Sequence, residues 1–571
     1  MRRSRRLSAL LAAAWAVAAC ASGRSGPALL SSESDARARV PLPPVAPATG
    51  PLKISVVYPR EGQLLTARDS NFIFGSVGKA GATLTVNGVP VPTLPNGAFL
   101  AFLPVPAGLA PRYELFARAG ADTARAAVTV RLPAPPPPPG LAGLAVTADT
   151  VSGDSLLTSP PDSLLTAPRD SLPRPPVDTA GATSAPPAAR VDTGAVYVTL
   201  GAPGAAPADT DLVVIGRPTP GGTYKWFFLP GTVVPVRGRS GDWVRVGLDE
   251  RLDVWVAAAD ATPLPPGTPA PARVARNVRV VPAERWVDVV IPMTARPPHQ
   301  VEELDRAIAL TLFGTTANTD IVQQLAADPL VRHVSWTQEG RDRARYVVHL
   351  ARAPYGYLAL WTGGAFVLRV RRPPTVRAAA PLRGLTIAVD PGHPPIGATG
   401  PTGLYEAVPT LAVGVRVQRL LEARGARVVM TRVTPSAVPL GDRPIIARRA
   451  DAHALVSIHL NALPDGVNPF TAHGTGTYWF HPHAVPLARA MQRALVRRMG
   501  LRDLGIYYDN LALARPTWMP AVLAEGAFIM IPEQEAALRT PEYQEAYARG
   551  VVEGLERYFA GLAGEAAADG R

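Results

Sequence analysis

The order of apolar and polar residues changes character near residue 380. Between residues 51 and 373, apolar residues alternate with polar ones over short runs such as Thr83-Leu84-Thr85-Val86, the period of a β-strand with one buried face. Beyond residue 380 the runs predict strands and helices, with strands at 384–389, 427–430, 454–458 and 521–523 and helices at 411–424, 485–499 and 543–559. Strands that alternate with helices predict a C-terminal α/β domain with a largely parallel sheet, which we place at residues 381–562.

The alternating part of the chain is predicted to form small all-β modules. The first spans residues 51–132, where Asn87-Gly88 and Asn96-Gly97 interrupt the apolar runs. Such pairs are typical of tight β-hairpin turns. Several short strands over about 80 residues resemble an immunoglobulin-like domain.

Two further modules follow. Residues 195–265 contain Trp243-Val244-Arg245-Val246 after a turn and Trp255-Val256 later, and this pattern resembles bacterial SH3-type barrels. Residues 274–373 alternate again and are similar to AMIN-type β domains. One helix is predicted within this third module, at 320–327.

Proline marks the connections between the modules. The chain has 63 prolines in 571 residues, about twice ordinary usage. Residues 133–194 contain five consecutive prolines and a short repeat of period eight, and such a segment favours an extended spacer that cannot pack a core. Residues 20–50, rich in Ser, Ala and Pro, are predicted to be a flexible tether.

The N-terminus has the pattern of an export signal. Four arginines among residues 2–6 precede a largely apolar stretch at 7–19 and then Cys20, which predicts a signal peptide at 1–19. Val17-Ala18-Ala19-Cys20 resembles a bacterial lipobox, which implies that Cys20 carries lipid and anchors the chain to a membrane. The alternative is an ordinary signal peptide with an incidental cysteine, but Cys20 is the only cysteine in the chain. Ala21 after it favours the outer membrane over the inner one.

Composition excludes several protein classes. A single cysteine excludes a disulfide-stapled protein, and no run of 18 or more apolar residues follows the N-terminus, which excludes a membrane-spanning protein. The formal net charge is +13, with the basic excess upstream of the C-terminal domain. This basic excess is consistent with a polyanionic partner in the envelope, or with arginines that are scattered over the surface and solvated. Nucleic acid is not expected as a partner, because the chain is exported and lacks an aromatic–basic motif.

Candidate chemistry gathers after the predicted strands of the C-terminal domain. His393 follows the first strand and His459 follows the strand at 454–458; because ligands collect at the carboxyl ends of strands in open α/β sheets, both imidazoles are expected to face one crevice. Zinc hydrolases commonly use three His or carboxylate ligands, and Glu406 can supply the third. Glu525 follows the last apolar strand, where an acid is costly unless paired or bound, so it is a general-base candidate.

Family resemblance extends this interpretation. The segments that carry it are Ile387-Ala388-Val389-Asp390-Pro391-Gly392-His393, Glu406, Thr431-Arg432, Leu440 with Arg443, Ser457-Ile458-His459-Leu460-Asn461-Ala462 and Pro520-Ala521-Val522-Leu523-Ala524-Glu525-Gly526-Ala527-Phe528. Over about residues 383–560 their order resembles the zinc-dependent N-acetylmuramoyl-L-alanine amidases (the Amidase_3 family). The resemblance implies zinc as cofactor.

Residue by residue, His393, Glu406 and His459 match the zinc ligands of that family, and Glu525 matches its catalytic glutamate. The implied activity is hydrolysis of the amide between N-acetylmuramic acid and L-alanine of peptidoglycan. We further expect Asn461, Arg443 and Arg515 to contact substrate. A protein of this kind is expected in the cell envelope, as a periplasm-facing lipoprotein, with possible envelope protein partners for its β modules.

Some positions depart from the family pattern. The family usually continues His-Gly-Gly, whereas Pro394-Pro395 follow His393 here, and Thr410 and Met530-Ile531 replace an asparagine and a serine–asparagine pair. Two alternatives therefore stay open: a catalytically degenerate peptidoglycan-binding scaffold, and a zinc hydrolase of another amide. Only 12 residues separate Asn461 from Gly474, where regulated relatives carry a longer inhibitory helix, so the site is expected to be open.

Overall fold

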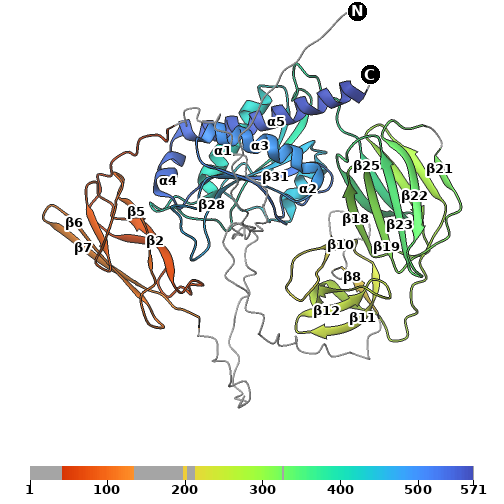
Figure 1. Cartoon of the computed structure of the whole chain (residues 1–571), viewed down its shortest axis with the longest axis horizontal. Helices are drawn as coiled ribbons and strands as arrows, with labels where there is room; N and C mark the ends of the chain where they lie inside the picture. Colours follow the sequence, from red (N-terminus) through yellow and green to blue (C-terminus); the bar gives the residue numbers. More distant parts are fainter. Residues whose placement is uncertain (1–40, 134–196, 202–212, 325–326, 570–571) are drawn as a thin grey trace, which may run out of the picture. The chain divides into compact units, whose positions relative to one another are not determined.

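The computed structural model describes residues 41–133, 197–201, 213–324 and 327–569, coloured along the sequence in Figure 1. The predicted signal peptide, the predicted lipidation site Cys20, most of the tether and nearly all of the 133–194 linker lie outside the described residues. Within the described part of the chain, no helix is both long and apolar enough to cross a bilayer.

Residues 55–129 form two antiparallel sheets with a common apolar core. The strands are β1 (Ser55–Tyr58), β2 (Ser70–Ser76), β3 (Thr83–Val86), β4 (Val89–Val91), β5 (Ala98–Pro104), β6 (Arg112–Ala119) and β7 (Asp122–Thr129). One sheet contains β1, β2 and β5, the other β3, β4, β6 and β7, and Ile73 and Phe99 are buried in the core. Asn87 and Gly88 have φ of 50° and 80°, so the hairpin turn predicted there is confirmed.

The second β-rich segment begins at Tyr197. Its elements are β8 (Tyr197–Leu200), β9 (Val214–Gly216), β10 (Trp226–Phe228), β11 (Val233–Ser240), β12 (Trp243–Gly247), β13 (Asp253–Ala257), a 3₁₀ helix η3 (Ala258–Asp260) and β14 (Ala261–Pro263). One sheet has the order β13-β12-β11-β8-β14, and β9 pairs with β10. Trp226, Phe228 and Val244 belong to the core of this segment.

The third β-rich segment places two larger sheets around one core that includes Val289, Leu310 and Tyr346. Its strands are β15 (Val274–Ala275), β16 (Val278–Pro282), β17 (Trp286–Pro292), β18 (His299–Leu304), β19 (Ala307–Phe313), β20 (Thr316–Ala317), β21 (Val322–Gln324), β22 (Val331–Gln338), β23 (Arg343–Leu350), β24 (Tyr357–Thr362) and β25 (Ala365–Arg371). The sheet orders are β21-β16-β17-β25-β24 and β18-β19-β23-β22, with β15 beside β20.

The helix predicted at 320–327 is wrong. Residues 322–324 are the strand β21, which pairs in parallel with β16. Just before it, the side-chain oxygen of Asn277 accepts hydrogen bonds from the backbone N–H groups of Asp320 (2.9 Å) and Ile321 (3.1 Å). Because these backbone groups find partners in a neighbouring strand and side chain, the segment satisfies them without a helix.

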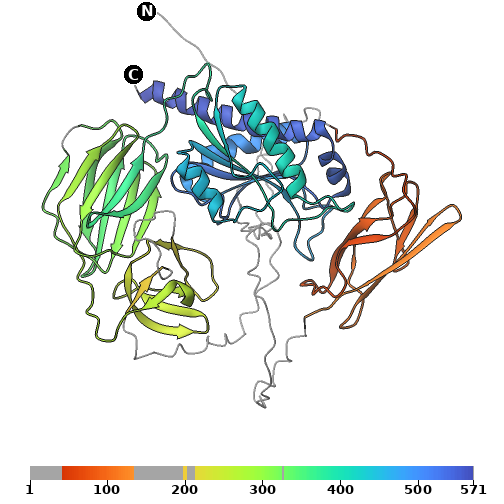
Figure 2. The same ribbon diagram turned by 180° about the vertical axis from the view of Figure 1, so that it is seen from behind.

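The C-terminal domain is the predicted α/β domain, seen from its two sides in Figures 1 and 2. Its elements are β26 (Thr386–Pro391), α1 (Ala407–Glu422), β27 (Arg427–Met430), α2 (Asp442–Arg449), β28 (Ala454–Asn461), β29 (Thr475–Trp479), η4 (Pro482–Ala484), α3 (Val485–Met499), β30 (Asp503–Tyr508), β31 (Ala521–Phe528), α4 (Pro532–Leu538) and α5 (Pro541–Asp569). Every predicted strand and helix of this domain is present, and α3 has the predicted bounds. Gly500 ends α3 with φ of 67°, the left-handed conformation that favours glycine after a helix.

The sheet of this domain has the strand order β27-β26-β28-β31-β29-β30. Neighbouring strands run parallel except β29, which is antiparallel to β31. The prediction of a largely parallel sheet is confirmed. The three central strands β26, β28 and β31 end side by side, which brings together chain segments far apart in the sequence.

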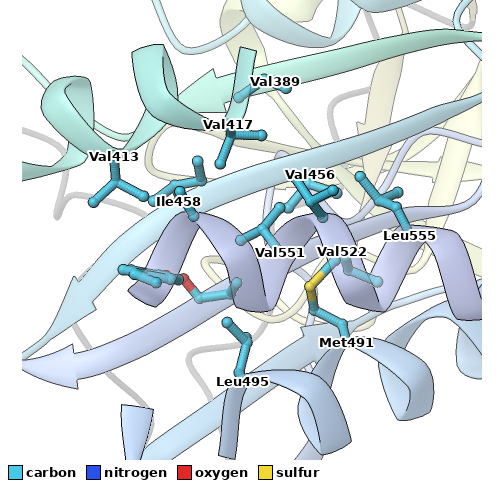
Figure 3. Packing of buried hydrophobic residues seen from close by; sticks show 14 of the residues in the cluster. Val389, Val413, Val417, Val456, Ile458, Met491, Leu495, Val522, Val551 and Leu555 are labelled. Carbon is cyan, nitrogen blue, oxygen red and sulfur yellow. The ribbon is translucent and has the colours of Figure 1, made fainter. Parts of the chain in front are cut away.

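Side chains alternate between the two faces of this sheet along each strand. Figure 3 shows the core on one face, formed by Val389, Val456, Ile458 and Val522 of the sheet with Val413 and Val417 of α1, Met491 and Leu495 of α3, and Val551 and Leu555 of α5. Alternate residues point to the other face, where Ala388, Leu455 and Ala521 pack with Ala447 of α2. Polar side chains two or four positions further along these strands therefore lie on the α2 face.

Candidate active site

Polar residues end the central strands on the α2 face. In the register of the sheet Asp390 lies beside Ser457, and His459 lies beside Glu525. Asp390 comes two positions after Ala388, Ser457 and His459 come two and four positions after Leu455, and Glu525 comes four positions after Ala521. Because side chains alternate along a strand, all four lie on the α2 face of the sheet. The sheet therefore places His459 and Glu525 side by side at its strand ends.

Three buried side chains form a cluster at these strand ends. His393, just after β26, and His459 of β28 both contact Glu406, which directly precedes α1. His393 Nε2 lies 3.2 Å from Glu406 Oε2, and His459 Nδ1 lies 3.2 Å from Glu406 Oε1. The three ligand atoms all lie within 4.8 Å of one another. The structure thus brings together the three predicted metal ligands.

This donor set fits a zinc ion. Two histidines and one carboxylate are a common ligand set of catalytic zinc, which leaves a fourth position for water. Ligand atoms about 2.1 Å from one tetrahedral ion are about 3.4 Å apart. His393 Nε2 lies 3.2 Å from Glu406 Oε2, and His459 Nδ1 lies 3.2 Å from the other oxygen, Oε1.

The carboxylate of Glu406 is fixed in place by the backbone. Its Oε2 accepts a hydrogen bond from Ala398 N–H (3.0 Å), and its Oε1 accepts one from Leu460 N–H (2.9 Å). Burial alone would raise the pKa of Glu406, but its contacts with His393 and His459 outweigh burial and lower that pKa. Glu406 is therefore held as an ionised carboxylate.

Glu525 has a different environment. Its Oε2 is buried and has no hydrogen-bond partner among the described residues. Burial, and then the negative charge of Glu406, raise the pKa of Glu525 well above its ordinary value. This environment favours the protonated form of the carboxyl group, a form that a general base must be able to adopt.

A cavity of about 220 Å³ opens onto the cluster. Polar side chains on its wall include His393, His459, Asn461, Tyr478 and Glu525. The apolar part of the wall consists of Pro394, Pro395, Ile396, Val438, Pro439, Leu440, Leu511, Ala512, Leu513 and Leu523. The cavity therefore joins two candidate metal ligands and the candidate base.

The three residues expected to contact substrate lie in different places. Asn461 lines the cavity and accepts a hydrogen bond from Ala462 N–H (2.8 Å). Arg443 also borders it but is 3% exposed, with its guanidinium bonded to protein oxygens. Arg515 is outside the wall of this cavity, and its Nε donates to Asn510 Oδ1 (2.6 Å).

Sequence reasoning assigned no role to Asp390 and Tyr478. Asp390 is fully buried and accepts hydrogen bonds from Thr431 Oγ1, Ser457 Oγ and Arg443 Nη1. The rule that singled out Glu525, that an acid at the end of a buried strand needs a partner, also applies to Asp390. Tyr478 of β29 lines the same cavity, and its position there follows from the order of the strands in the sheet, which the sequence does not show.

The segment after β28 contains no helix. All of residues 462–474 are described, and they form turns and irregular structure. This agrees with the expectation that no inhibitory helix follows Asn461.

Comparison with known proteins identifies the C-terminal domain. A profile of the family described as N-acetylmuramoyl-L-alanine amidase matches residues 387–557. The probable cell wall amidase LytH of Staphylococcus epidermidis is 33% identical over 183 residues, which cover 31% of this chain and 60% of LytH. LytH of Staphylococcus saprophyticus is 32% identical over 208 residues, 36% of this chain and 67% of that protein. The chain thus spans between about three fifths and two thirds of the length of these curated relatives.

Solved structures are similar over about 30% of the chain. An N-acetylmuramoyl-L-alanine amidase from Clostridium difficile 630 is 31% identical, covers 30% of this chain and 96% of its own, and gives a TM-score of 0.29. The catalytic domain of CwlV from Bacillus (Paenibacillus) polymyxa var. colistinus is 30% identical. It covers 30% of this chain and 97% of its own, with a TM-score of 0.29. On the family profile and the identity to LytH, the chain belongs, through its C-terminal domain, to the N-acetylmuramoyl-L-alanine amidase family.

Proposed function

We propose that the protein is a zinc-dependent hydrolase that cleaves the amide between N-acetylmuramic acid and L-alanine of peptidoglycan. The observation that carries this proposal is the cluster of His393, Glu406 and His459, with Glu525 on the wall of the same cavity. Membership of the amidase family supports the choice of substrate. Cleavage of a different amide would need another pocket on the same catalytic groups.

In the proposed mechanism, His393, Glu406 and His459 hold the zinc ion. Zinc, when bound, polarises a carbonyl group and lowers the pKa of bound water. Glu525 accepts a proton from the attacking water and returns it to the departing alanine nitrogen. Its raised pKa supports this double role, because the carboxyl group must keep the proton between the two transfers.

The test uses the full chain on isolated peptidoglycan, with zinc and with a chelator, beside Glu525→Gln. We expect zinc-dependent release of stem peptides with new L-alanine amino termini, reduced about 10²- to 10⁴-fold in the variant. Glu533→Gln, at an exposed position on α4, serves as the matched control and is expected to retain activity. Stoichiometric zinc with binding to the cell wall but no cleavage would support the degenerate scaffold instead.

We also propose that the protein is an envelope lipoprotein anchored through Cys20, facing the periplasm from the outer membrane. The support is the charge, length and cleavage-site pattern of residues 1–20. The β-rich segments, proposed as immunoglobulin-like, SH3-like and AMIN-like modules, would then present the amidase domain to peptidoglycan or to envelope protein partners. Labelled fatty acid should be incorporated by the wild type and not by Cys20→Ser; unlabelled wild type recovered in the soluble fraction would exclude the anchor.

A further inference from the structure

The turn that carries His393 has an unusual backbone. His393 has φ of 60°, in the left-handed region that residues other than glycine rarely adopt. Pro394 and Pro395 follow it, and neither has an N–H group that could hold the turn by hydrogen bonding. Before His393, Gly392 N–H donates to Ile458 O (2.9 Å), but after His393 the two prolines leave only carbonyl groups to hold this part of the turn.

Carbonyl oxygens of the turn provide the attachment. Pro391 O accepts from Arg432 Nε (2.8 Å), and Gly392 O accepts from Arg432 Nη2 (2.9 Å) and Thr410 Oγ1 (2.8 Å). The next two carbonyls, of His393 and Pro394, accept from Arg443. Four consecutive carbonyl groups are thus held by the side chains of two buried arginines.

Arg443 uses its full hydrogen-bonding capacity in this way. An arginine side chain has five N–H donors: one on Nε and two on each Nη. Their acceptors are Val438 O for Nε (3.1 Å), Asp390 Oδ1 and Pro391 O for Nη1 (3.1 Å each), and His393 O (3.2 Å) and Pro394 O (2.8 Å) for Nη2. No donor remains for a substrate, although Arg443 borders the cavity.

We propose that Arg443 is a positioning residue, which locks the turn of residues 391–394 and thereby aims His393 at the metal. Asp390 orients Arg443 from β26 and balances its buried charge. Arg432 and Thr410 hold the first half of the same turn, and Thr410 does so from the helix that follows Glu406. The metal part of this proposal rests on the proposed function; the locking of the turn does not.

The test is Arg443→Lys in the full chain, because lysine keeps the charge but has three N–H donors in place of a planar fork. Arg489→Lys, at an exposed position on α3, is the matched control. In the metal-free protein, we expect faster hydrogen exchange at the amides of Gly392 and Ala398 in Arg443→Lys only. We also expect the dissociation constant for zinc, measured by chelator competition, to rise about 10- to 100-fold, with kcat lowered and KM unchanged.

Other results would overturn the proposal. A raised KM with unchanged zinc affinity and unchanged exchange would make Arg443 a substrate contact. If the wild type binds no zinc, the proposed function fails, while the exchange comparison still decides whether Arg443 locks the turn. If Arg443→Lys does not fold, Thr410→Val tests the same turn, because it removes the hydroxyl that contacts Gly392 O, Glu406 O and Arg432 Nη2. It should weaken zinc binding by a smaller factor, and unchanged exchange at Gly392 together with unchanged affinity would contradict the proposal.

Discussion

Glu525 lies beside His459 in the parallel pairing of β31 with β28. The two side chains therefore share one face of the sheet, but their contacts differ. His459 contacts Glu406, whereas Glu525 Oε2 has no hydrogen-bond partner among the described residues. In the proposed mechanism this difference holds the imidazole for metal binding and leaves the neighbouring carboxyl group available for proton transfer.

Removing the carboxylate ligand should remove the metal. Glu406→Gln keeps an oxygen acceptor for one of the two backbone N–H groups, of Ala398 or Leu460, and loses the charge. We expect zinc content after dialysis at fixed free zinc, measured by mass spectrometry, to fall from about one per chain to near zero. Glu422→Gln, exposed near the end of α1, should keep its zinc. Full zinc retention by Glu406→Gln would remove Glu406 from the ligand set.

The buried carboxyl group of Glu525 should lower the free energy of unfolding of the metal-free protein. Because folding raises the pKa of Glu525 above the ordinary 4.5, the folded state binds the proton more tightly than the unfolded state. The resulting loss of stability is absent at low pH and grows as pH rises above 4.5. We expect Glu525→Gln, in chelator, to be about 1 kcal/mol more stable than the wild type at pH 8, with little difference at pH 4. Thermal melts at both pH values measure this, and a variant less stable at pH 8 would contradict it.

His453 should make the domain sensitive to acid. Its Nδ1 accepts a hydrogen bond from Thr386 N–H (2.9 Å), which requires the neutral ring. Burial lowers the pKa of His453 from 6.5 to about 4, so the unfolded state binds more protons between these pH values. Stability is therefore full above pH 6.5 and falls as pH drops toward 4, by about 1–2 kcal/mol after allowance for partial exposure.

The matched variant for this prediction is His453→Asn, whose amide oxygen can accept from Thr386 N–H without titrating. Urea unfolding at pH 7.5 and pH 5 should show a smaller acid loss in this variant than in the wild type. Arg489→Lys, at an exposed position on α3, is the control and should lose stability with acid as the wild type does. Equal acid losses in all three proteins would show that His453 does not contribute.

Gly526 should not tolerate a side chain. A Cβ there would lie 2.4 Å from the ring of Tyr547, whose hydroxyl bonds to the carbonyls of His459 (3.1 Å) and Ala524 (2.7 Å). We expect Gly526→Ala to lower the free energy of unfolding by about 1–3 kcal/mol and to weaken zinc binding, because Tyr547 must move away from β28. Gly441→Ala meets no atom within 4 Å and should be nearly neutral. Denaturant unfolding and chelator competition compare the two; equal values would contradict the prediction.

Local patterns predicted the C-terminal domain well because its elements are strongly periodic. The amphipathic spacing of 485–499 matches α3, and the apolar runs place β26, β28 and β31. The same reasoning failed at 320–327, where strand pairing with β16 overrides local preference. Arg515 stays a predicted substrate contact, and the local pattern did not predict that its guanidinium bonds to Asn510.

The sequence by itself determined which residues stand at strand ends. Each apolar run predicts a buried strand, and the polar residue after it, His393, His459 or Glu525, is the candidate functional side chain. Both can be identified from neighbouring residues alone, because side chains alternate along a strand. Only the tertiary structure decided which of these ends are neighbours. Sheet order placed β28 between β26 and β31, and long-range packing brought Arg443 of α2 to the carbonyls around His393. Those contacts join segments dozens of residues apart, so no local period along the chain encodes them.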